Sequence, residues 1–288
     1  MECQLAPLEA YVHERQHDLP AMQLSASSGS CEITTVVSSL ELDSAFQAIY
    51  CARTGRPVGY EALLRASDID GRQVPPPEVF ATSRGFNEIA RLERLCRAMH
   101  IAAFGKQSLS TTTDLFLNVD GNHLPDIACG DALPLSRLLS DCNLTPRRVV
   151  LEILESEIAD STEVISAIAL CRKQGYRVAI DDFGRGKSNA ARLFQLKPDI
   201  VKLDRSLIAS AAARGYGKRV FTQVVRTCHE LGASVVCEGI ETSRQDDIAT
   251  AVGCELLQGY FYSRPQTTLA QELIVRADSA LSCASNPA

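Results

Sequence analysis

Seven short apolar segments of the chain carry a polar side chain inside them or at their C-terminal end. The polar residues are Glu61, Asn118, Glu152, the pair Asp181 and Asp182, Lys202, Glu238 and Gln258. A single carboxylate in such a place is usually solvated or caps a helix, and a single lysine usually extends to water. Several carboxylates that converge on one small volume raise one another's pKa unless cations balance them. If this set meets at one site, that site requires cations.

Two divalent ions would balance the charges of the set. Its five carboxylates are Glu61, Glu152, Asp181, Asp182 and Glu238. Lys202 and two divalent ions would together supply the matching five positive charges. Carboxylate oxygens and the carbonyl of Asn118 are ligands that Mg²⁺ and Mn²⁺ prefer. Two such ions about 3.5–4 Å apart can activate a water molecule and hold a phosphate oxygen during phosphodiester hydrolysis.

The segment AIDDFGRGKSNAARL, residues 179–193, also contains the letters GKS that end a phosphate-binding P-loop. A P-loop requires a glycine five positions before the second glycine, which is position 181 in this chain. Asp181 stands there, and Asp182 follows it. Two carboxylates at this point would repel the phosphates that the loop is meant to bind. The segment therefore indicates a metal site and no P-loop.

The composition indicates a soluble globular protein. Of the 288 residues 45% are hydrophobic and 22% are charged, and the net charge of -6 gives no reason to expect a nucleic-acid polymer as partner. The 11 cysteines are scattered without a C-x-x-C pair, which suits a reducing compartment. No apolar run approaches the roughly 20 residues that cross a bilayer, and the N-terminus does not resemble a secretory signal. We expect a cytoplasmic protein with no membrane partner.

A repeating pattern of strands and helices must position the polar residues. Eight apolar segments read as strands: residues 44–50, 57–65, 115–120, 149–154, 177–183, 199–204, 234–241 and 256–263. Stretches with helical periodicity separate them, for example residues 217–233. Eight strands that alternate with helices predict an α/β fold, a (β/α)8 TIM-like barrel, whose catalytic face is the C-terminal end of its strands.

The first two strand segments are joined only by the short turn CARTGR, which predicts an antiparallel strand near the start of the barrel. An open doubly wound sheet is the alternative architecture. Residues 1–37 are expected to be an N-terminal extension, with a short helix in LEAYVHERQH and a flexible connection at 24–32. Residues 38–275 would form the barrel, and 276–288 a C-terminal tail.

Seven motifs in this chain resemble those of the EAL-domain cyclic di-GMP phosphodiesterases in both order and spacing. They are YEALLR (60–65), LFLNVD (115–120), LEILES (151–156), IDDFGRGKS (180–188), IVKLDRSLI (200–208), CEGIET (237–242) and QGYFYSRP (258–265). The resemblance covers about residues 38–275. It implies a (β/α)8 barrel with an antiparallel strand and hydrolysis of cyclic di-GMP to linear pGpG, with two Mg²⁺ or Mn²⁺ ions per active site.

The resemblance also implies roles for individual residues. Six would bind the metals: Glu61, Asn118, Glu152, Asp181, Asp182 and Glu238, with Asp181 shared between the two ions. Lys202 would hold the attacking water, and Glu241 and Gln258 would position water or metal ligands. Substrate contacts would come from Arg65, Gln47 and Leu63. Glu155 would anchor the loop after the aspartate pair, and the loop would connect the site to a homodimer interface.

Arg185 and Lys187 depart from the family's loop, which has a small residue and an aromatic residue at these positions. Three hypotheses follow. The chain is an active cyclic di-GMP hydrolase, or a catalytically weak or silent module that acts as a cyclic di-GMP receptor or a protein-binding regulator, or a two-metal phosphodiesterase for another nucleotide. The N-terminal extension could in addition bind a protein partner.

Overall fold

The structure of the chain is a computed structural model. It describes residues 6–15, 22–26, 33–37, 39–81, 86–107, 112–130, 132–155, 162–186, 190–213 and 215–270. The statements below concern these residues. The predicted C-terminal tail, 276–288, lies outside them.

Eight strands form a closed barrel. They are β3 (Leu40–Cys51), β4 (Pro57–Asp68), β5 (Asp114–Asn118), β6 (Val149–Leu154), β7 (Arg177–Phe183), β8 (Ile200–Leu203), β9 (Ser234–Cys237) and β10 (Leu256–Leu257). The strand order is β3-β10-β9-β8-β7-β6-β5-β4, and the pairing of β3 with β4 closes the ring. The predicted barrel is therefore confirmed, and the open doubly wound sheet is wrong.

Strand β3 is the predicted antiparallel strand. It runs antiparallel to both of its barrel neighbours, β4 and β10, whereas the pairs from β4 to β10 around the rest of the ring are parallel. The cause is the short connection between β3 and β4, where the Cys51 amide donates to the Arg56 carbonyl over 2.9 Å. A turn of this length can join only antiparallel neighbours.

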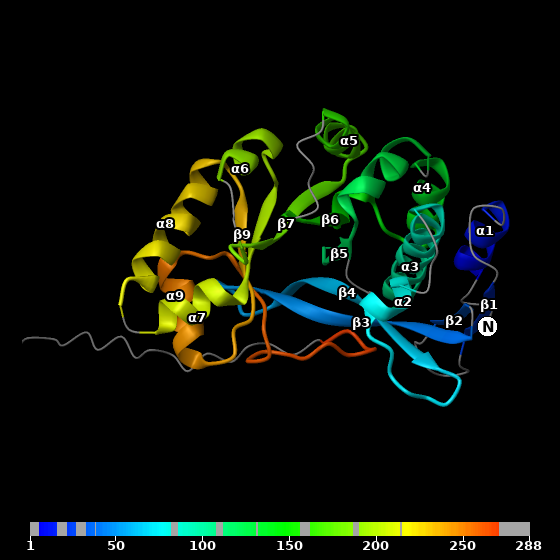
Figure 1. The fold of residues 1–288 in the computed structure, drawn as a ribbon, viewed down its shortest axis with the longest axis horizontal. Coiled ribbons are helices and arrows are strands. Elements are labelled where there is room, and N and C mark those ends of the chain that lie inside the picture. Colours follow the sequence, from blue (N-terminus) through cyan, green and yellow to red (C-terminus); the bar gives the residue numbers. More distant parts are fainter. Residues whose placement is uncertain are drawn as a thin grey trace, which may run out of the picture.

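Helices surround the barrel (Figure 1). They are α2 (Pro76–Ala81), α3 (Phe86–Gln107), α4 (Ala132–Asp141), α5 (Thr162–Lys173), α6 (Ala190–Leu196), α7 (Arg205–Ala212), α8 (Gly217–Glu230) and α9 (Ser243–Val252). Short single-turn helices occur at η1 (Gly121–His123), η2 (Asp126–Gly130) and η3 (Pro146–Arg148). The large apolar core lies between strands and helices, and a smaller one fills the barrel interior with Ile49, Phe116, Val150, Ala179, Ile200 and Val236.

The described parts of residues 1–37 pack against the barrel. Helix α1 (Ala6–Glu14) lies beside α3 and α4 in Figure 1, with Leu8 and Tyr11 buried and Glu14 paired to Arg137 over 3.1 Å. Strands β1 (Met22–Ala26) and β2 (Ile33–Val37) extend the sheet beyond β3. Of the predicted flexible connection, residues 24–26 belong to β1 and 27–32 lie outside the described residues.

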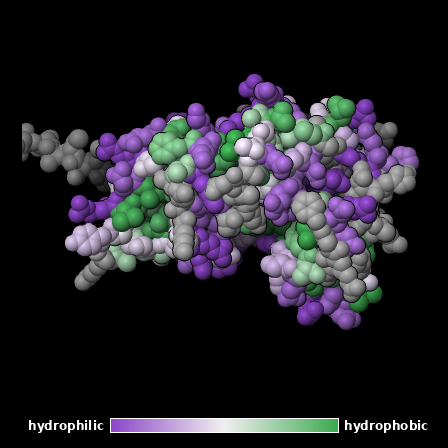
Figure 2. Space-filling view, turned by 45° about the horizontal axis from the view of Figure 1, so that its top comes forward, coloured by the Kyte–Doolittle hydropathy of each residue, from purple (hydrophilic) through white to green (hydrophobic). Residues whose placement is uncertain are grey.

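The surface is predominantly hydrophilic on the face drawn in Figure 2, where hydrophobic residues appear only in small separate patches. None of the helices that the structure describes combines the length and the apolar character that crossing a bilayer requires.

Candidate active site

A layer of polar side chains lies directly above the apolar layer inside the barrel. Side chains alternate along a strand, so residues two positions apart face the same side. The apolar residues Phe116, Val150, Ala179, Ile200 and Val236 are therefore followed, two positions later, by Asn118, Glu152, Asp181, Lys202 and Glu238. Both layers come from parallel strands, and the polar layer lies at their C-terminal ends, where the sequence predicted it.

Lys202 lies at the centre of this polar layer. Its ammonium nitrogen is 3.2 Å from Glu61 Oε2, 2.7 Å from Glu152 Oε1, 3.2 Å from Asp181 Oδ1 and 2.9 Å from Glu238 Oε1. The Lys202 side chain is only 1% exposed. Four carboxylates from β4, β6, β7 and the end of β9 thus meet around a single buried cation. One ammonium group cannot neutralise four carboxylates.

Amide side chains hold Glu61 in place. Gln258 Nε2 donates to Glu61 Oε2 over 2.7 Å, and Asn118 Nδ2 donates to Glu61 Oε1 over 3.2 Å. Gln47, the residue opposite Glu61 in the β3–β4 register, accepts a hydrogen bond from Gln258 over 3.3 Å and donates to the Ser263 carbonyl over 3.1 Å. Side chains from β3, from the end of β5 and from the position after β10 therefore fix the carboxylate of Glu61.

The carboxylates of the centre have shifted pKa values because they are buried and crowded. Burial, with the charges of Asp181 and Glu61, outweighs the effect of Lys202 and raises the pKa of Glu238 to about 8. Burial also raises the pKa of Glu152 and of Asp181, against the opposing charge of Lys202. Burial acts in the same direction on Glu61, but Lys202 and the amide hydrogen bonds outweigh it, so the pKa of Glu61 is lowered.

The centre suits divalent cations. Two groups of carboxylates offer ligand atoms within 4.8 Å of one another: Glu61, Glu152 and Asp181 form one, and Asp181, Asp182 and Glu238 form the other. Asp181 belongs to both. Glu152 Oε1 contacts the Lys202 ammonium, whereas Oε2, which is also buried, accepts no hydrogen bond from the described residues. Ligand atoms that are buried, oxygen-only and short of positive charge are what Mg²⁺ or Mn²⁺ requires.

Arg185 contacts one of these carboxylates. Its Nη1 lies 2.6 Å from Asp182 Oδ2, and the Arg185 side chain is 72% exposed. Asp182 itself has a positive φ of 55°, which turns the chain sharply at the end of β7. Lys187 lies outside the described residues. Glu155 is buried, and its carbonyl accepts from Arg192 over 2.7 Å; its expected action on the loop stays a prediction.

A cavity of about 540 Å³ opens onto the centre, lined by Gln47, Glu61, Asp182, Arg185, Asp204, Arg205, Ser206, Glu238, Gly239, Glu241, Gln258, Gly259 and Tyr260. Glu241 is therefore at this cavity, and it is exposed. Arg65 instead lines a second cavity of about 400 Å³ beside Gln266 and Thr267. Leu63 lies between Glu61 and Arg65 on the same face of β4 and is half-buried.

Sequence reasoning missed several residues of the cavity lining, among them Asp204, Arg205 and Tyr260. Asp204 follows β8 directly and caps α7 by accepting from the Ser206 amide over 2.9 Å. It carried the same signal as the predicted residues, a carboxylate at the end of a strand. Tyr260 is 52% exposed and is covered on one side by Arg264, whose guanidinium carbon is 4.3 Å from the ring centroid. No spacing in the sequence indicates that contact.

The fold and the site define a barrel protein with an acidic centre at the C-terminal ends of its strands. The EAL domain family matches residues 31–265, and the chain belongs to this family. The three letters of the family name occur in β4, at Glu61, Ala62 and Leu63.

The curated relatives include a cyclic di-GMP phosphodiesterase and an oxygen sensor protein. The cyclic di-GMP phosphodiesterase RocR of Pseudomonas aeruginosa is 26% identical over 254 residues, which cover 87% of this chain and 64% of RocR. The oxygen sensor protein DosP of Escherichia coli is 27% identical over 237 residues, 80% of this chain and 29% of DosP. The chain therefore spans less than two thirds of either relative.

Solved structures of similar fold contain cyclic di-GMP. BlrP1 of Klebsiella pneumoniae, in complex with calcium and cyclic di-GMP, has a TM-score of 0.72 and 25% identity, covering 95% of this chain and 69% of BlrP1. The manganese complex of BlrP1 has a TM-score of 0.70 and 26% identity, and the match covers 92% of this chain and 67% of BlrP1. A standalone EAL protein of Vibrio cholerae O395, bound to cyclic di-GMP, has a TM-score of 0.69 and 25% identity. The match covers 79% of this chain and 94% of the Vibrio protein.

Proposed function

We propose that this chain is a phosphodiesterase that hydrolyses cyclic di-GMP to linear pGpG with two Mg²⁺ or Mn²⁺ ions. The observation that carries the proposal is the meeting of Glu61, Glu152, Asp181 and Glu238 around Lys202, with Asp181 common to two groups of ligands. The name of RocR and the cyclic di-GMP bound in BlrP1 support the choice of substrate.

In this proposal each of the two groups of ligands holds one metal ion. Glu61, Asn118, Glu152 and Asp181 would hold the first, and Asp181, Asp182 and Glu238 the second. Bound ions would supply an activated water and charge stabilisation at the phosphate. The conversion of cyclic di-GMP to pGpG adds one water across one of its two phosphodiester bonds, so the product keeps both guanosines and both phosphates.

The remaining residues would orient the reactants. Lys202 has its ammonium within 3.2 Å of four of the five carboxylates, those of Glu61, Glu152, Asp181 and Glu238, so it can hold a water that one of them deprotonates. Gln258 fixes Glu61 through its 2.7 Å hydrogen bond. Glu241 would position water at the cavity. Arg65, with Gln47 and Leu63, would contact the substrate, because a guanidinium can donate two hydrogen bonds to one phosphate.

The proposal is tested by incubating the purified chain with cyclic di-GMP and Mg²⁺, Mn²⁺ or a chelator, and separating the products by chromatography. We expect pGpG with either ion and no product with the chelator. Hydrolysis that survives chelation contradicts a metal-dependent reaction. Turnover of other cyclic nucleotides at an equal rate would contradict the substrate assignment.

The 2.6 Å pair between Arg185 and Asp182 favours a second candidate function. A guanidinium on Asp182 competes with a metal ion for that carboxylate, which would weaken the second site. The chain would then bind cyclic di-GMP with little turnover and act as a receptor or as a protein-binding regulator. Calorimetry that detects binding of cyclic di-GMP with Mg²⁺ present, together with no pGpG after long incubation, would select this function.

Further parts of the proposal concern assembly and location. A homodimer is supported by Phe194, which is 58% exposed on α6, the helix that follows the Arg185 loop. A cytoplasmic location is supported by the eight described cysteines, all of which are free thiols. Residues 1–37 remain a proposed contact for a protein partner. Light scattering of the purified chain tests the dimer.

A further inference from the structure

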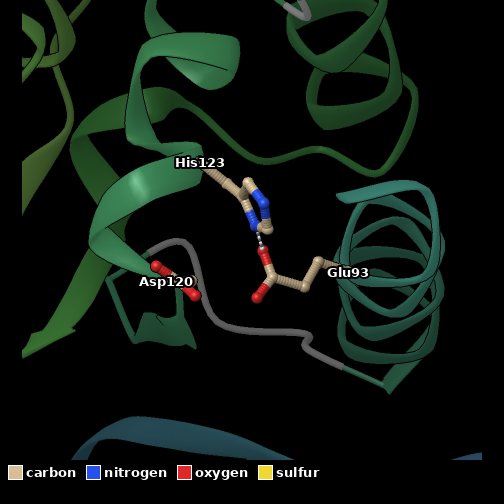
Figure 3. Close-up of side chains that lie close together, drawn as sticks. All are labelled: Glu93, Asp120 and His123. Atoms are coloured by element: carbon tan, nitrogen blue, oxygen red, sulfur yellow. Dashed lines mark hydrogen bonds and ion pairs between the residues drawn. The ribbon is translucent and has the colours of Figure 1, made fainter. Parts of the chain in front are cut away.

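A second group of metal-type ligands lies outside the mouth of the barrel, between α3 and the turn η1. It consists of Glu93 from α3, Asp120 at the start of η1 and His123 at the end of η1. Figure 3 shows His123 and Glu93 pointing at each other, with Asp120 close by. One ligand atom of each residue lies within 4.8 Å of a ligand atom of the other two. None of the three belongs to the carboxylate centre around Lys202.

Hydrogen bonds hold all three side chains in their positions. His123 Nδ1 is 2.7 Å from Glu93 Oε2, with the His123 side chain 4% exposed and that of Glu93 17% exposed. Asp120 Oδ1 accepts from the Asn122 amide over 2.8 Å and from the Asn122 side chain over 2.9 Å. The rotamers are therefore fixed before any ligand binds, which lowers the entropic cost of binding one.

The group itself combines two carboxylates with one imidazole. A third nearby carboxylate, Asp126, is paired with Arg94 over 3.5 Å. Two carboxylates beside one imidazole nitrogen favour a positive charge between them.

We infer that Glu93, Asp120 and His123 bind a zinc-type divalent cation, with water completing the coordination. One imidazole nitrogen and two carboxylate oxygens suit Zn²⁺ better than Mg²⁺, which prefers oxygen ligands alone. Two ligands of a tetrahedral Zn²⁺ ion stand about 3.3 Å apart, from metal–ligand bonds of about 2.0 Å. The pair of His123 and Glu93, at 2.7 Å, needs to open by only a fraction of an ångström when the metal replaces the shared proton.

The place of the group in the fold gives the ion a structural role. It would tie α3 to the segment that leaves β5, in which Asp120 follows Asn118 by two residues. The carboxylate centre, with oxygen ligands only, and this group, with its imidazole, would select different ions. The inference does not depend on the proposed function, because binding of Zn²⁺ here requires neither cyclic di-GMP nor turnover.

The experiment titrates Zn²⁺ into the metal-free full chain in the presence of saturating Mg²⁺, by calorimetry. An Asp181→Asn background removes the carboxylate that both ligand groups of the barrel centre share. We expect one Zn²⁺ ion per chain, with an affinity at least tenfold lower in His123→Gln. Co²⁺ added in place of Zn²⁺ should give visible absorption bands with the background variant. These bands should be absent when His123→Gln is added to that background.

Two conservative variants separate ion binding from folding. Asp120→Asn keeps the oxygen that accepts from the Asn122 amide but removes a negative charge, and Glu93→Gln keeps a partner for the imidazole. Both substitutions should lower the affinity for Zn²⁺ at least tenfold while the circular dichroism spectrum stays unchanged. Glu88→Gln, on the same helix but outside the group, should leave Zn²⁺ affinity unchanged. No Zn²⁺ uptake in the background variant, or uptake that none of the three substitutions alters, would reduce the group to an ordinary ion pair.

Discussion

At the scale of single residues, Lys202 and its four carboxylates determine both the stability and the chemistry of the centre. Each of the four oxygen atoms lies between 2.7 and 3.2 Å from the ammonium. Burial lowers the pKa of a lysine, but Asp181, Glu152, Glu238 and Glu61 outweigh it and raise the pKa of Lys202 well above its usual value. The raised pKa favours the charged ammonium, so the carboxylates carry the variable charge of the centre.

Replacing Glu61 by Gln should remove hydrolysis without unfolding the chain. The substitution keeps the shape of the side chain and one oxygen that can accept from Gln258 or Asn118, but it removes a negative charge that a metal ion needs. We expect kcat/KM for cyclic di-GMP to fall by at least about a thousandfold, the size of a lost transition-state contact of about 4 kcal/mol. Glu230→Gln, exposed on α8, serves as the control with unchanged rate. Near wild-type turnover in Glu61→Gln would place the active site elsewhere.

Replacing Lys202 by Met should destabilise the metal-free chain strongly. Removal of one partner from a buried set of charges typically costs about 3–5 kcal/mol. The loss should be larger at pH 8 than at pH 5, since Glu238 and Glu152 can take up protons at the lower pH and reduce the repulsion. Urea unfolding of the variant and the wild type at pH 5 and at pH 8 measures this loss of stability. Equal stability of the variant and the wild type at pH 8 would show that Lys202 does not balance the carboxylates.

At the scale of elements, strand periodicity made the polar layer predictable. Each of its residues stands in or just after an apolar segment, so the sequence indicated both the strands and their functional ends. Segment 256–263 was predicted as a strand, but β10 contains only Leu256 and Leu257. Gly259 explains the difference, because a Cβ on it would lie 2.1 Å from the Ile240 carbonyl oxygen. The backbone at Gly259 packs directly against the backbone of Ile240, and a hydropathy pattern does not indicate such close contact.

The loop after β7 gives a prediction at the same scale. Replacing Arg185 by Thr removes the 2.6 Å contact with Asp182 and releases that carboxylate for a metal ion. We expect the Mn²⁺ affinity of the weaker site to rise about twofold to fivefold, since an exposed ion pair contributes little to stability. Titration of Mn²⁺ followed by electron paramagnetic resonance measures it. Arg244→Thr, exposed on α9, is the matched control, and equal Mn²⁺ isotherms for the two variants would contradict the competition.

At the scale of the whole molecule, barrel closure is what brings distant residues together. Glu61 and Gln258 are almost 200 positions apart in the chain, and they meet because β3 pairs with both β4 and β10. The sequence predicted the barrel from eight alternating segments. It did not predict β1, because MQLSA lacks the periodicity of a strand. It also missed β2, although the β-branched run ITTVV is typical of a strand. Nor did it indicate the group of Glu93, Asp120 and His123, because Glu93 comes from α3, far along the chain from the η1 turn that carries the other two.

The carboxylate centre makes the stability of the whole chain depend on pH and metal. The pKa of Glu238 is about 8 in the folded chain against an ordinary 4.5, and those of Asp181 and Glu152 are raised as well. Between pH 4.5 and 8 the folded chain thus binds protons that the unfolded chain has released, so the free energy of unfolding falls as the pH rises. The slope is up to about 1.4 kcal/mol per pH unit for each such proton.

Divalent ions should reverse this loss, because they replace the protons on the carboxylates. We expect urea unfolding of the metal-free chain to show lower stability at pH 8 than at pH 5.5, and saturating Mn²⁺ to stabilise the chain most at pH 8. At one hundred times the dissociation constant the gain is about 2.7 kcal/mol. Glu238→Gln should flatten the metal-free pH dependence. Stability that rises toward pH 8 without metal would mean that the carboxylates are already ionised at pH 5.5, and the need for cations would lose its physical basis.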